Sequence, residues 1–168
     1  MNVDLVQIRL LGEKKRDENL RFRRFMKSRD HSDRILRRIA EDIEEQIDCT
    51  ACANCCRVAT ALVTERDAER LSRYLRISPA QFRAQYTEES EDEGRVLFRT
   101  AEAGCVFLEG NTCTVYKARP DACQRFPHLV RGAGSIASRM WQFVDRATYC
   151  PIVYHALEAF KQELRFHR

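Results

Sequence analysis

The sequence contains no apolar run that approaches the ~20 residues a helix needs to cross a membrane. Its 168 residues are 44% hydrophobic, which is typical of a soluble globular chain. Residues 1–11 carry Asp4 and Arg9 and lack the small-residue cleavage pattern of a signal peptide. We therefore expect a protein with no membrane span, located in the cytoplasm, where thiols stay reduced.

Several signatures of catalysis are also missing. There is no glycine-rich loop after a strand to cradle a nucleotide-type cofactor, no Ser-His-Asp array and no paired-carboxylate motif. Repeats, low-complexity tracts and a sharp linker are absent as well, so the length fits one domain, or one domain with an appendage. The sequence leaves open whether the protein is an enzyme; Arg119 and His128 are the polar groups near the cysteines to test.

Cysteine, by contrast, is abundant, and half of it is concentrated in one run. Four thiols lie within the eight residues 49–56, spaced as C-x2-C-x2-C-C. Each C-x2-C step folds into a tight turn that aims two sulfurs at one point, as metal ions and iron–sulfur clusters require. Disulfides need about 5.5–6 Å between Cα atoms, so crowded cysteines make poor disulfide partners. The run therefore predicts metal ligation.

The later cysteines are needed to complete the coordination, because tetrahedral sites take four ligands. We expect the metal ligands to be Cys49, Cys52, Cys55, Cys56, Cys105, Cys113, Cys123 and Cys150. Adjacent side chains diverge by about 100° on a helix, so Cys55 and Cys56 do not readily chelate one ion together. Cys56 thus indicates a second centre or a supporting thiol. One site with spare thiols and two four-thiolate sites both remain open.

The identity of the metal is indicated by the spacing. Cys49, Cys52 and Cys55 match the first part of a bacterial ferredoxin run, and Cys150-Pro151 resembles its end, which favours a 4Fe-4S cluster over zinc. Zinc is also satisfied by four thiolates. Four histidines could substitute as ligands: His31, His128, His155 and His167.

Four thiolates leave a net charge of about −2 on either a zinc site or a 4Fe-4S cluster. A permanent positive charge nearby would offset it and tune a redox potential. We therefore take three arginines as candidate cofactor-binding residues: Arg57, Arg119 and Arg125.

Residues 1–48 predict a basic helical N-terminal arm. We interpret residues 1–11 as a strand or a docking segment, and expect a helix from Ser32 or Asp33. That helix has apolar residues at helical spacing, namely Ile35, Leu36, Ile39, Ile43 and Ile47. Between Arg9 and Arg38, twelve Lys and Arg face five Asp and Glu, a net charge of +7. We favour a solvated helix face as the interpretation of this charge over a binding surface. As a binding surface the arm suits an acidic protein partner or a membrane surface; nucleic acid is less favoured, since no nucleic-acid motif is present.

Residues 49–168 predict a cysteine-cluster metal-binding domain. Thr64 stands three residues before Asp67 in a variant capping box, and Ser78 precedes Pro79 at a first helical position, so two helices are expected. We expect an exposed acidic loop over 87–94, a strand over 95–100, a hairpin turn at 109–111 and a helix over 152–166. The predicted class is α+β: a small helix-rich domain with short strands packed around a cysteine-ligated metal centre.

Four blocks of the sequence together carry a family resemblance: 47–57, 105–116, 118–127 and 150–151. They resemble the zinc- or iron-chelating domain family of YkgJ-like cysteine-cluster proteins, over about 49–151. The chain has Ala53 where the family often has Gly, so the turn there must avoid a strictly Gly-only conformation. It also has Gln124 where Arg is frequent, with Arg at 125.

Three functions follow as hypotheses. The first is a cytoplasmic protein that ligates a 4Fe-4S cluster in a redox or electron-transfer role. The second is a structural zinc-binding module that mediates partner interaction. The third is a metal-dependent enzyme or accessory subunit, because the cysteine pattern also resembles part of the flagellin lysine methylases and so implies a link to methyl transfer.

Overall fold

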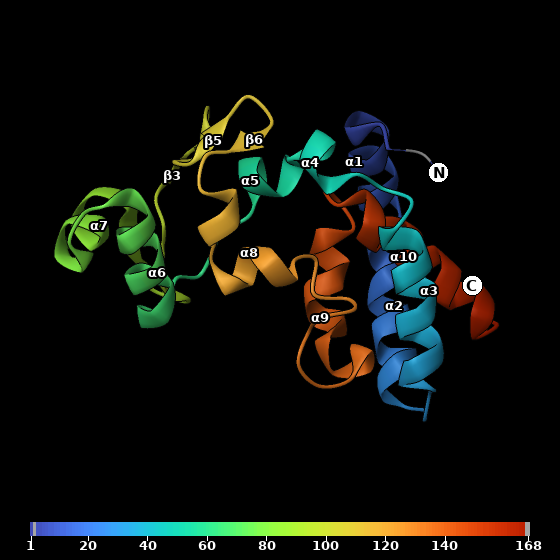
Figure 1. Cartoon of the computed structure of the whole chain (residues 1–168). Coiled ribbons are helices and arrows are strands. Elements are labelled where there is room, and N and C mark those ends of the chain that lie inside the picture. Colours follow the sequence, from blue (N-terminus) through green and yellow to red (C-terminus); the bar gives the residue numbers. More distant parts are fainter. Residues whose placement is uncertain (2, 167–168) are drawn as a thin grey trace. The chain divides into compact units, whose positions relative to one another are not determined.

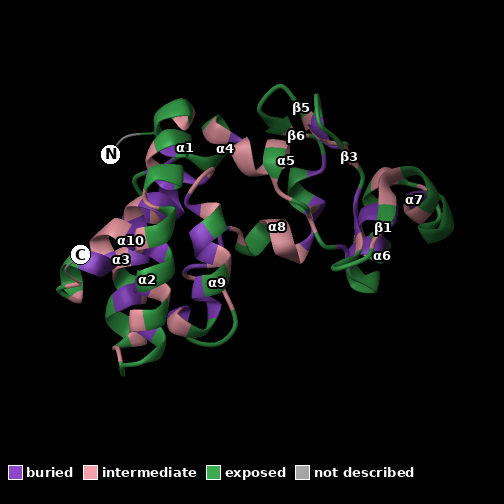
Figure 2. Cartoon of the chain, turned by 180° about the vertical axis from the view of Figure 1, so that it is seen from behind, coloured by how far each residue is buried: buried purple, intermediate pink, exposed green. Residues whose placement is uncertain are grey.

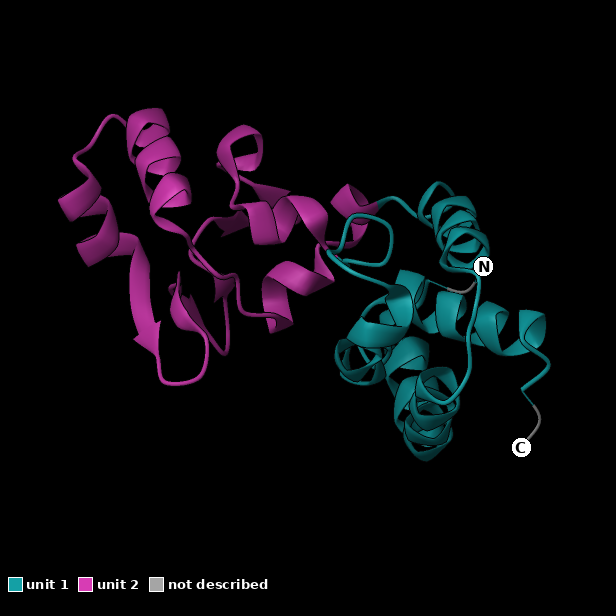
Figure 3. Ribbon diagram, turned by 90° about the horizontal axis from the view of Figure 1, so that it is seen from below, with its two compact units in different colours: residues 1–48, 127–168 teal, residues 49–126 magenta. Residues whose placement is uncertain are grey.

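The computed structural model describes residue 1 and residues 3–166, and it has the α+β class predicted from the sequence (Figure 1). By internal contacts the chain divides into two compact units. Unit 1 comprises residues 1–48 and 127–168, and unit 2 comprises residues 49–126 (Figure 3). The last part of the predicted 49–168 segment, residues 127–168, therefore packs in unit 1.

Unit 1 is built from long helices. They are α1 (Leu5–Lys14), α2 (Arg16–Lys27), α3 (Asp33–Glu44), α9 (Ile136–Arg146) and α10 (Pro151–Glu163). Helix α10 packs against α1, α3 and α9, and α2 packs against α9. Buried residues run along α2, α9 and α10 (Figure 2). The core of unit 1 thus forms around α10.

The predicted helix from Ser32 or Asp33 is confirmed as α3, with Ser32 at its N-cap. Its predicted apolar stripe buries Leu36 and Ile43 but leaves Ile35 43% exposed. The strand interpretation of residues 1–11 is wrong, since this segment enters helix α1. Asp4 explains the difference, because its carboxylate accepts hydrogen bonds from the first backbone N–H groups of the helix.

A buried network of charges connects α10 to the start of α2. Lys161 Nζ donates to Glu18 Oε1 and Glu158 Oε1, both at 2.7 Å, and its side chain is only 6% exposed. Lys15 donates to the other carboxylate oxygen of Glu158. Two ammonium groups therefore face two carboxylates, and each carboxylate depends on a cation in a poorly solvated place.

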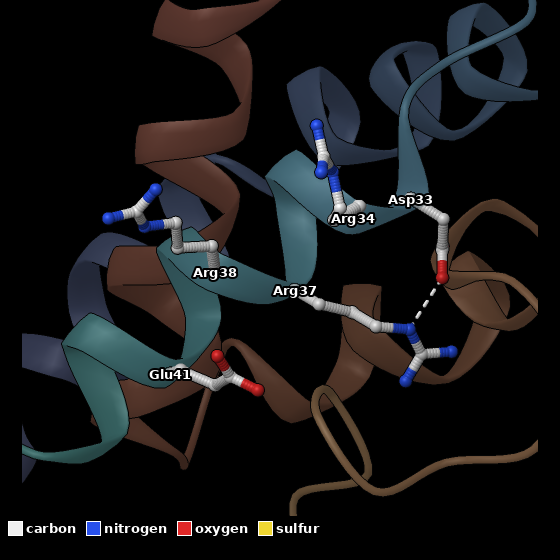
Figure 4. Close-up of a pocket in the computed structure, with 5 residues that line it drawn as sticks. All are labelled: Asp33, Arg34, Arg37, Arg38 and Glu41. Carbon is white, nitrogen blue, oxygen red and sulfur yellow. Dashed lines mark hydrogen bonds and ion pairs between the residues drawn. The ribbon is translucent and has the colours of Figure 1, made fainter.

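Unit 1 also holds the loop 127–135 through arginines. Arg37 pairs with Asp33 on its own helix, as drawn in Figure 4, and donates to the carbonyls of Val130 and Gly134. Buried Arg139 donates to carbonyls of the same loop, including that of Ser135 at 3.2 Å. The loop's backbone thus receives hydrogen bonds from two directions, which fixes its path.

Unit 2 is made of short elements. In chain order they are α4 (Cys49–Cys52), α5 (Asn54–Val58), α6 (Glu65–Leu75), α7 (Pro79–Tyr86), β1 (Thr87–Ser90), β2 (Gly94–Leu97), β3 (Arg99–Thr100), β4 (Gly104–Cys105), β5 (Leu108–Glu109), β6 (Thr112–Cys113), the 3-10 helix η1 (Tyr116–Ala118) and α8 (Asp121–Arg125). The strands pair as antiparallel hairpins, β1 with β2, β3 with β4 and β5 with β6. The predicted capping box of Thr64 with Asp67 is confirmed, and so is the predicted N-cap at Ser78 before Pro79, where Gln81 completes a second capping box.

The predicted acidic loop 87–94 is wrong in part, because β1 occupies its first half. Register pairs Glu88 with Val96 and Glu89 with Arg95. The Glu89 carboxylate forms an ion pair with the Arg95 guanidinium. Charged side chains on the exposed face of a two-stranded hairpin are tolerated when they find opposite charges across the strands, while Val96 and Leu97 of β2 are buried. The acidic composition of this segment therefore did not exclude a strand.

Unit 2 has an apolar core of its own. The buried residues that form it are Val63, Ala68, Leu71, Phe82, Leu97, Phe107, Val115 and Ala118. Cys105 and Cys113 pack against this core while remaining half-buried. Tyr86 stacks between Phe82 and Phe107, with ring centroids 5.8 and 5.0 Å away. The cysteine-bearing strands thus rest on a packed apolar base.

Lys161→Ala should lower the free energy of unfolding by about 3 kcal/mol, because poorly solvated Glu18 loses its cation at 2.7 Å and keeps only Lys15 at 4.0 Å. Urea denaturation at pH 7 measures the change. Arg16→Ala is the matched control, since Arg16 pairs with Asp145 while 44% exposed, and exposed pairs contribute about 0–1 kcal/mol. Equal losses in the two variants would show that the buried charge network stabilises the fold no more than an exposed ion pair does.

Candidate metal centre

The cysteine run forms two short helical turns rather than one continuous helix. Helices α4 and α5 are separated by Ala53, which adopts a left-handed conformation (φ 48°, ψ 14°). A residue with a Cβ reaches this region at a cost of roughly 1–2 kcal/mol. Alanine is therefore tolerated at a position where glycine would fit without strain. The reversal at Ala53 sets the direction in which Cys55 and Cys56 leave the backbone.

Four cysteines from separate segments of unit 2 lie in one neighbourhood. Burial raises the pKa of Cys105 to about 11 and that of Cys123 to about 12, and nearby thiols add to both shifts. Burial also raises the pKa of Cys113. The charge of Cys56 contributes to all three shifts. We refer to Cys56, Cys105, Cys113 and Cys123 as the thiol tetrad.

Cys56 differs from the other three members of the tetrad. Its pKa is lowered to about 7, mainly by a hydrogen bond from the Cys55 thiol and also by the charge of Arg57, against the effect of burial. At neutral pH, Cys56 is therefore the member closest to the thiolate form that binds metal. The sequence marked it as the odd member of the run, and the structure groups it with the later cysteines.

The donor set of the tetrad suits the expected cofactors. Four thiolates satisfy either a tetrahedral zinc ion or a 4Fe-4S cluster. Across the described residues, no three or more Cys, His, Asp or Glu side chains are gathered at metal-binding distance. The tetrad is therefore a group of thiols that influence one another's ionisation, and their role as metal ligands stays a prediction.

Close backbone packing places Cys105 next to Cys56. Helix α5 and strand β4 pack together, and Gly104 adopts a φ of +77°. A Cβ built on Gly104 would lie 2.7 Å from the Cys56 carbonyl oxygen and 2.9 Å from Cα of Arg57. Only glycine allows this approach, because both atoms belong to the backbone and cannot swing away.

A buried carboxylate places Cys123. Asp67, 1% exposed, accepts from the backbone N–H of Asp121 at 3.1 Å at the start of α8. Arg70 binds Asp67 and donates to the carbonyl of Arg119 at 3.0 Å. Burial would raise the pKa of Asp67, but hydrogen bonds from Thr64, Asp121 and Arg70 outweigh it and lower that pKa. The carboxylate is thus ionised, and it anchors the segment that carries Cys123.

The three predicted arginines have different surroundings. Arg57 donates to the carbonyl of Cys52 at 3.2 Å and to that of Gly110 at 2.8 Å. Arg119 lies over the Tyr116 ring and lowers the pKa of Cys113 and Cys123, though burial raises both. Arg125 forms an exposed ion pair with Asp121 at 3.7 Å. Arg57 and Arg119 therefore act electrostatically on tetrad thiols.

The remaining cysteines are placed as follows. Cys49 is exposed, and Cys52 and Cys55 are half-buried, all in unit 2. Cys150 is buried at the N-cap of α10 in unit 1. Their role as ligands stays a prediction.

The candidate histidines that the structure describes lie in unit 1. His31 stacks on Phe25, His155 makes an edge contact with Tyr154, and His128 has a φ of 67° in the loop after Pro127. His167 lies outside the described residues. The ligand role proposed for these histidines also stays a prediction.

Sequence reasoning did not identify the residues that hold the tetrad in place. Asp67 was recognised only as a helix cap, although it also binds α8, and Gly104 gave a weak signal as a glycine directly before a cysteine. Asn111 was assigned to a hairpin turn without a further role, yet its side chain donates to the Ala51 carbonyl at 2.8 Å. These contacts join segments far apart in the chain, so spacing alone does not reveal them.

Comparison with known families agrees with this donor set. Residues 48–151 match the CxxCxxCC family, described as "Putative zinc- or iron-chelating domain". The chain belongs to this family. The matched range contains all eight cysteines. No solved structure matches the chain. In the residues that the structure describes, no helix has the length and apolar character needed to span a membrane.

Metal binding to the tetrad should release protons. Because the pKa values of Cys105, Cys113 and Cys123 are raised, these thiols are protonated at pH 7 and must lose their protons to bind. We expect about three to four protons per Zn²⁺ added in small amounts to metal-free protein, and weaker binding as the pH falls from 8 to 6. A pH indicator in dilute buffer measures the release. Fewer than about two protons per ion would contradict tetrad ligation.

Gly104→Ala should reduce metal retention, because the new methyl group forces β4 away from α5 and Cys105 away from Cys56. The matched control is Gly94→Ala, since Gly94 has a similar φ of +80° but nothing within 4 Å of a built Cβ. Both variants incur the left-handed penalty of roughly 1–2 kcal/mol. Metal content per chain after gel filtration should fall only for Gly104→Ala. Equal retention would show that the close approach is dispensable.

Proposed function

We propose that this protein holds an iron–sulfur cluster of the 4Fe-4S type through its cysteines and serves a redox or electron-transfer role. The observation that carries the proposal is the thiol tetrad, in which Cys56 lies beside three cysteines from separate segments. An all-thiol donor set is the ligand chemistry that such clusters use, and the two-residue spacing of the neighbouring Cys49, Cys52 and Cys55 resembles a ferredoxin run. Membership of a zinc- or iron-chelating family supports the metal-binding part of the proposal.

The apolar core of unit 2 favours a functional cluster over a structural zinc. Structural zinc sites supply folding energy to domains that lack a sufficient core of their own. Unit 2 already buries Phe82, Leu97 and Phe107, and polar contacts aimed at the backbone fix the tetrad segments. The metal is therefore not needed to stabilise the fold of unit 2, which leaves it available for electron transfer.

The charges around the tetrad suit a redox centre. Arg57 lowers the pKa of Cys56, although the hydrogen bond from Cys55 is the larger cause. Positive charge close to the sulfurs stabilises the reduced, more negative cluster and so raises its potential. The half-buried setting of Cys105 and Cys113 limits water at the sulfurs, which is a second factor in tuning the potential.

A redox role requires a partner, and the basic surface of α3 suits an acidic protein. Arg34 and Arg38 are exposed and line a shallow hollow together with Arg37, Asp33 and Glu41 (Figure 4). Arg37 is committed to the 127–135 loop, which leaves the two exposed arginines to meet carboxylates. Helices α1–α3 pack within unit 1, so we propose a folded basic surface rather than a free arm.

Anaerobic purification tests the proposal directly. The protein should be brown, absorb near ~400 nm, bleach with dithionite and contain equal amounts of iron and sulfide. Cys113→Ser should lose most of this absorbance while unit 2 keeps its fold. Colourless protein with stoichiometric zinc would contradict the iron–sulfur assignment.

Removal of the metal distinguishes the hypothesis of a functional cluster from that of a structural zinc module. Because unit 2 has its own core, metal-free protein should keep the cooperative thermal unfolding of unit 2 in addition to that of unit 1. Calorimetry of protein stripped by chelation measures the total unfolding enthalpy. A fall of this enthalpy to the part that unit 1 alone supplies would favour the structural zinc module instead.

A further inference from the structure

Two side chains connect the cysteine run to the β5–β6 hairpin. Asn111 Nδ2 donates to the Ala51 carbonyl at 2.8 Å, and Asn111 Oδ1 accepts from Arg57 Nη2. Arg57 also donates to the carbonyl of Gly110 at 2.8 Å and to that of Cys52 at 3.2 Å. We call these four hydrogen bonds the Arg57–Asn111 clamp.

The clamp uses the bonding capacity of both side chains. Asparagine offers a donor and an acceptor on one rigid group, and here each has a partner in a different segment. The planar guanidinium of Arg57 reaches two carbonyls and one amide oxygen at fixed angles, which a lysine ammonium cannot reproduce. Neither aspartate nor lysine could therefore complete the clamp at these positions.

The clamp lies next to the tetrad in sequence and in space. Arg57 directly follows Cys56, and Asn111 precedes Cys113 by two residues across a hairpin whose register pairs Leu108 with Cys113. Fixing the Gly110–Asn111 turn against the cysteine run therefore fixes the backbone of Cys113 relative to that of Cys56.

We propose that Asn111, acting with Arg57, is a positioning residue for the metal centre, which sets the separation between the cysteine run and Cys113. This inference rests on the proposed function, because it assigns the clamp to the same tetrad. Asn111 acts through the backbone of the ligand segments and does not contact the metal. Its exposed position means that the clamp contributes little to folding, since exposed hydrogen bonds add only a small net stability.

Metal release from holoprotein tests the proposal. Protein purified anaerobically with its own metal is mixed with excess chelator, and loss of the metal–thiolate absorbance is followed over time. Asn111→Ala should release metal about 10–100-fold faster than wild type, the range typical of residues that orient ligands. Asn111→Asp keeps the acceptor for Arg57 but loses the donor to Ala51, and should be intermediate. Thr112→Ala, the next exposed residue of the hairpin, should match wild type.

The Arg57→Lys variant distinguishes an effect of hydrogen-bond geometry from an effect of positive charge. The variant keeps the positive charge beside Cys56 but loses the planar fork, so it should release metal as fast as Asn111→Ala. The double variant Arg57→Ala/Asn111→Ala should be no faster than the faster single variant, because both remove one clamp. Melting temperatures of the metal-free proteins should agree within a few degrees, which a purely structural role would not allow.

The outcomes distinguish failure of the positioning role of Asn111 from failure of the proposed function. Wild-type protein that retains neither iron nor zinc would contradict the proposed function and this inference with it. If wild type holds metal and Asn111→Ala holds it equally long, the inference alone is overturned. Release at the wild-type rate from Arg57→Lys would likewise overturn it, because charge rather than geometry would then be sufficient.

Discussion

The constraint on which unit 2 depends is that four sulfur atoms must come close together although three of them, those of Cys105, Cys113 and Cys123, resist ionisation there. Burial and the neighbouring thiols raise the pKa of Cys105 and Cys123 to about 11 and 12. Gathering thiolates without a cation is therefore unfavourable, and the chain cannot hold them together through the cysteines themselves. Other residues of unit 2 must therefore bring the four cysteines together.

Those residues act almost entirely on the backbone. Asp67 and Arg70 bind the segment before Cys123, Gly104 lets β4 approach α5, and Arg57 with Asn111 connects the run to the hairpin. Side chains that bind backbone groups hold the ligand segments without occupying the sulfur atoms. This arrangement allows a site that is pre-positioned in its segments and still able to close on an ion.

Sequence patterns predicted the structural features that depend on residues close together in the chain. The capping signals at Thr64 and Ser78, the α3 stripe and the family blocks all depend on residues within a few positions of each other, and each was found. Cys56 shows the limit of this approach. From spacing it could only be called the odd member of its run, because the cysteines it lies beside come about 50 to 70 residues later.

The predictions failed at two segments for different reasons. The acidic segment at Glu88 and Glu89 has poor strand propensity, yet it pairs with β2 and Glu89 forms an ion pair with Arg95. Residues 1–11 look like a short apolar lead-in, but Asp4 caps a helix there through contacts two and three residues away. The first segment depends on its partner strand, and the second on a local cap that the apolar pattern obscured.

The division of the chain has a consequence for the order in which the protein is made. Unit 2 is continuous in sequence, whereas unit 1 needs both residues 1–48 and residues 127–168. Helix α10, around which unit 1 packs, is synthesised only after the whole of unit 2. Domains fold as units during synthesis. The core of unit 2 and the segments that carry the thiol tetrad can thus fold on a nascent chain whose helical unit is still unfinished.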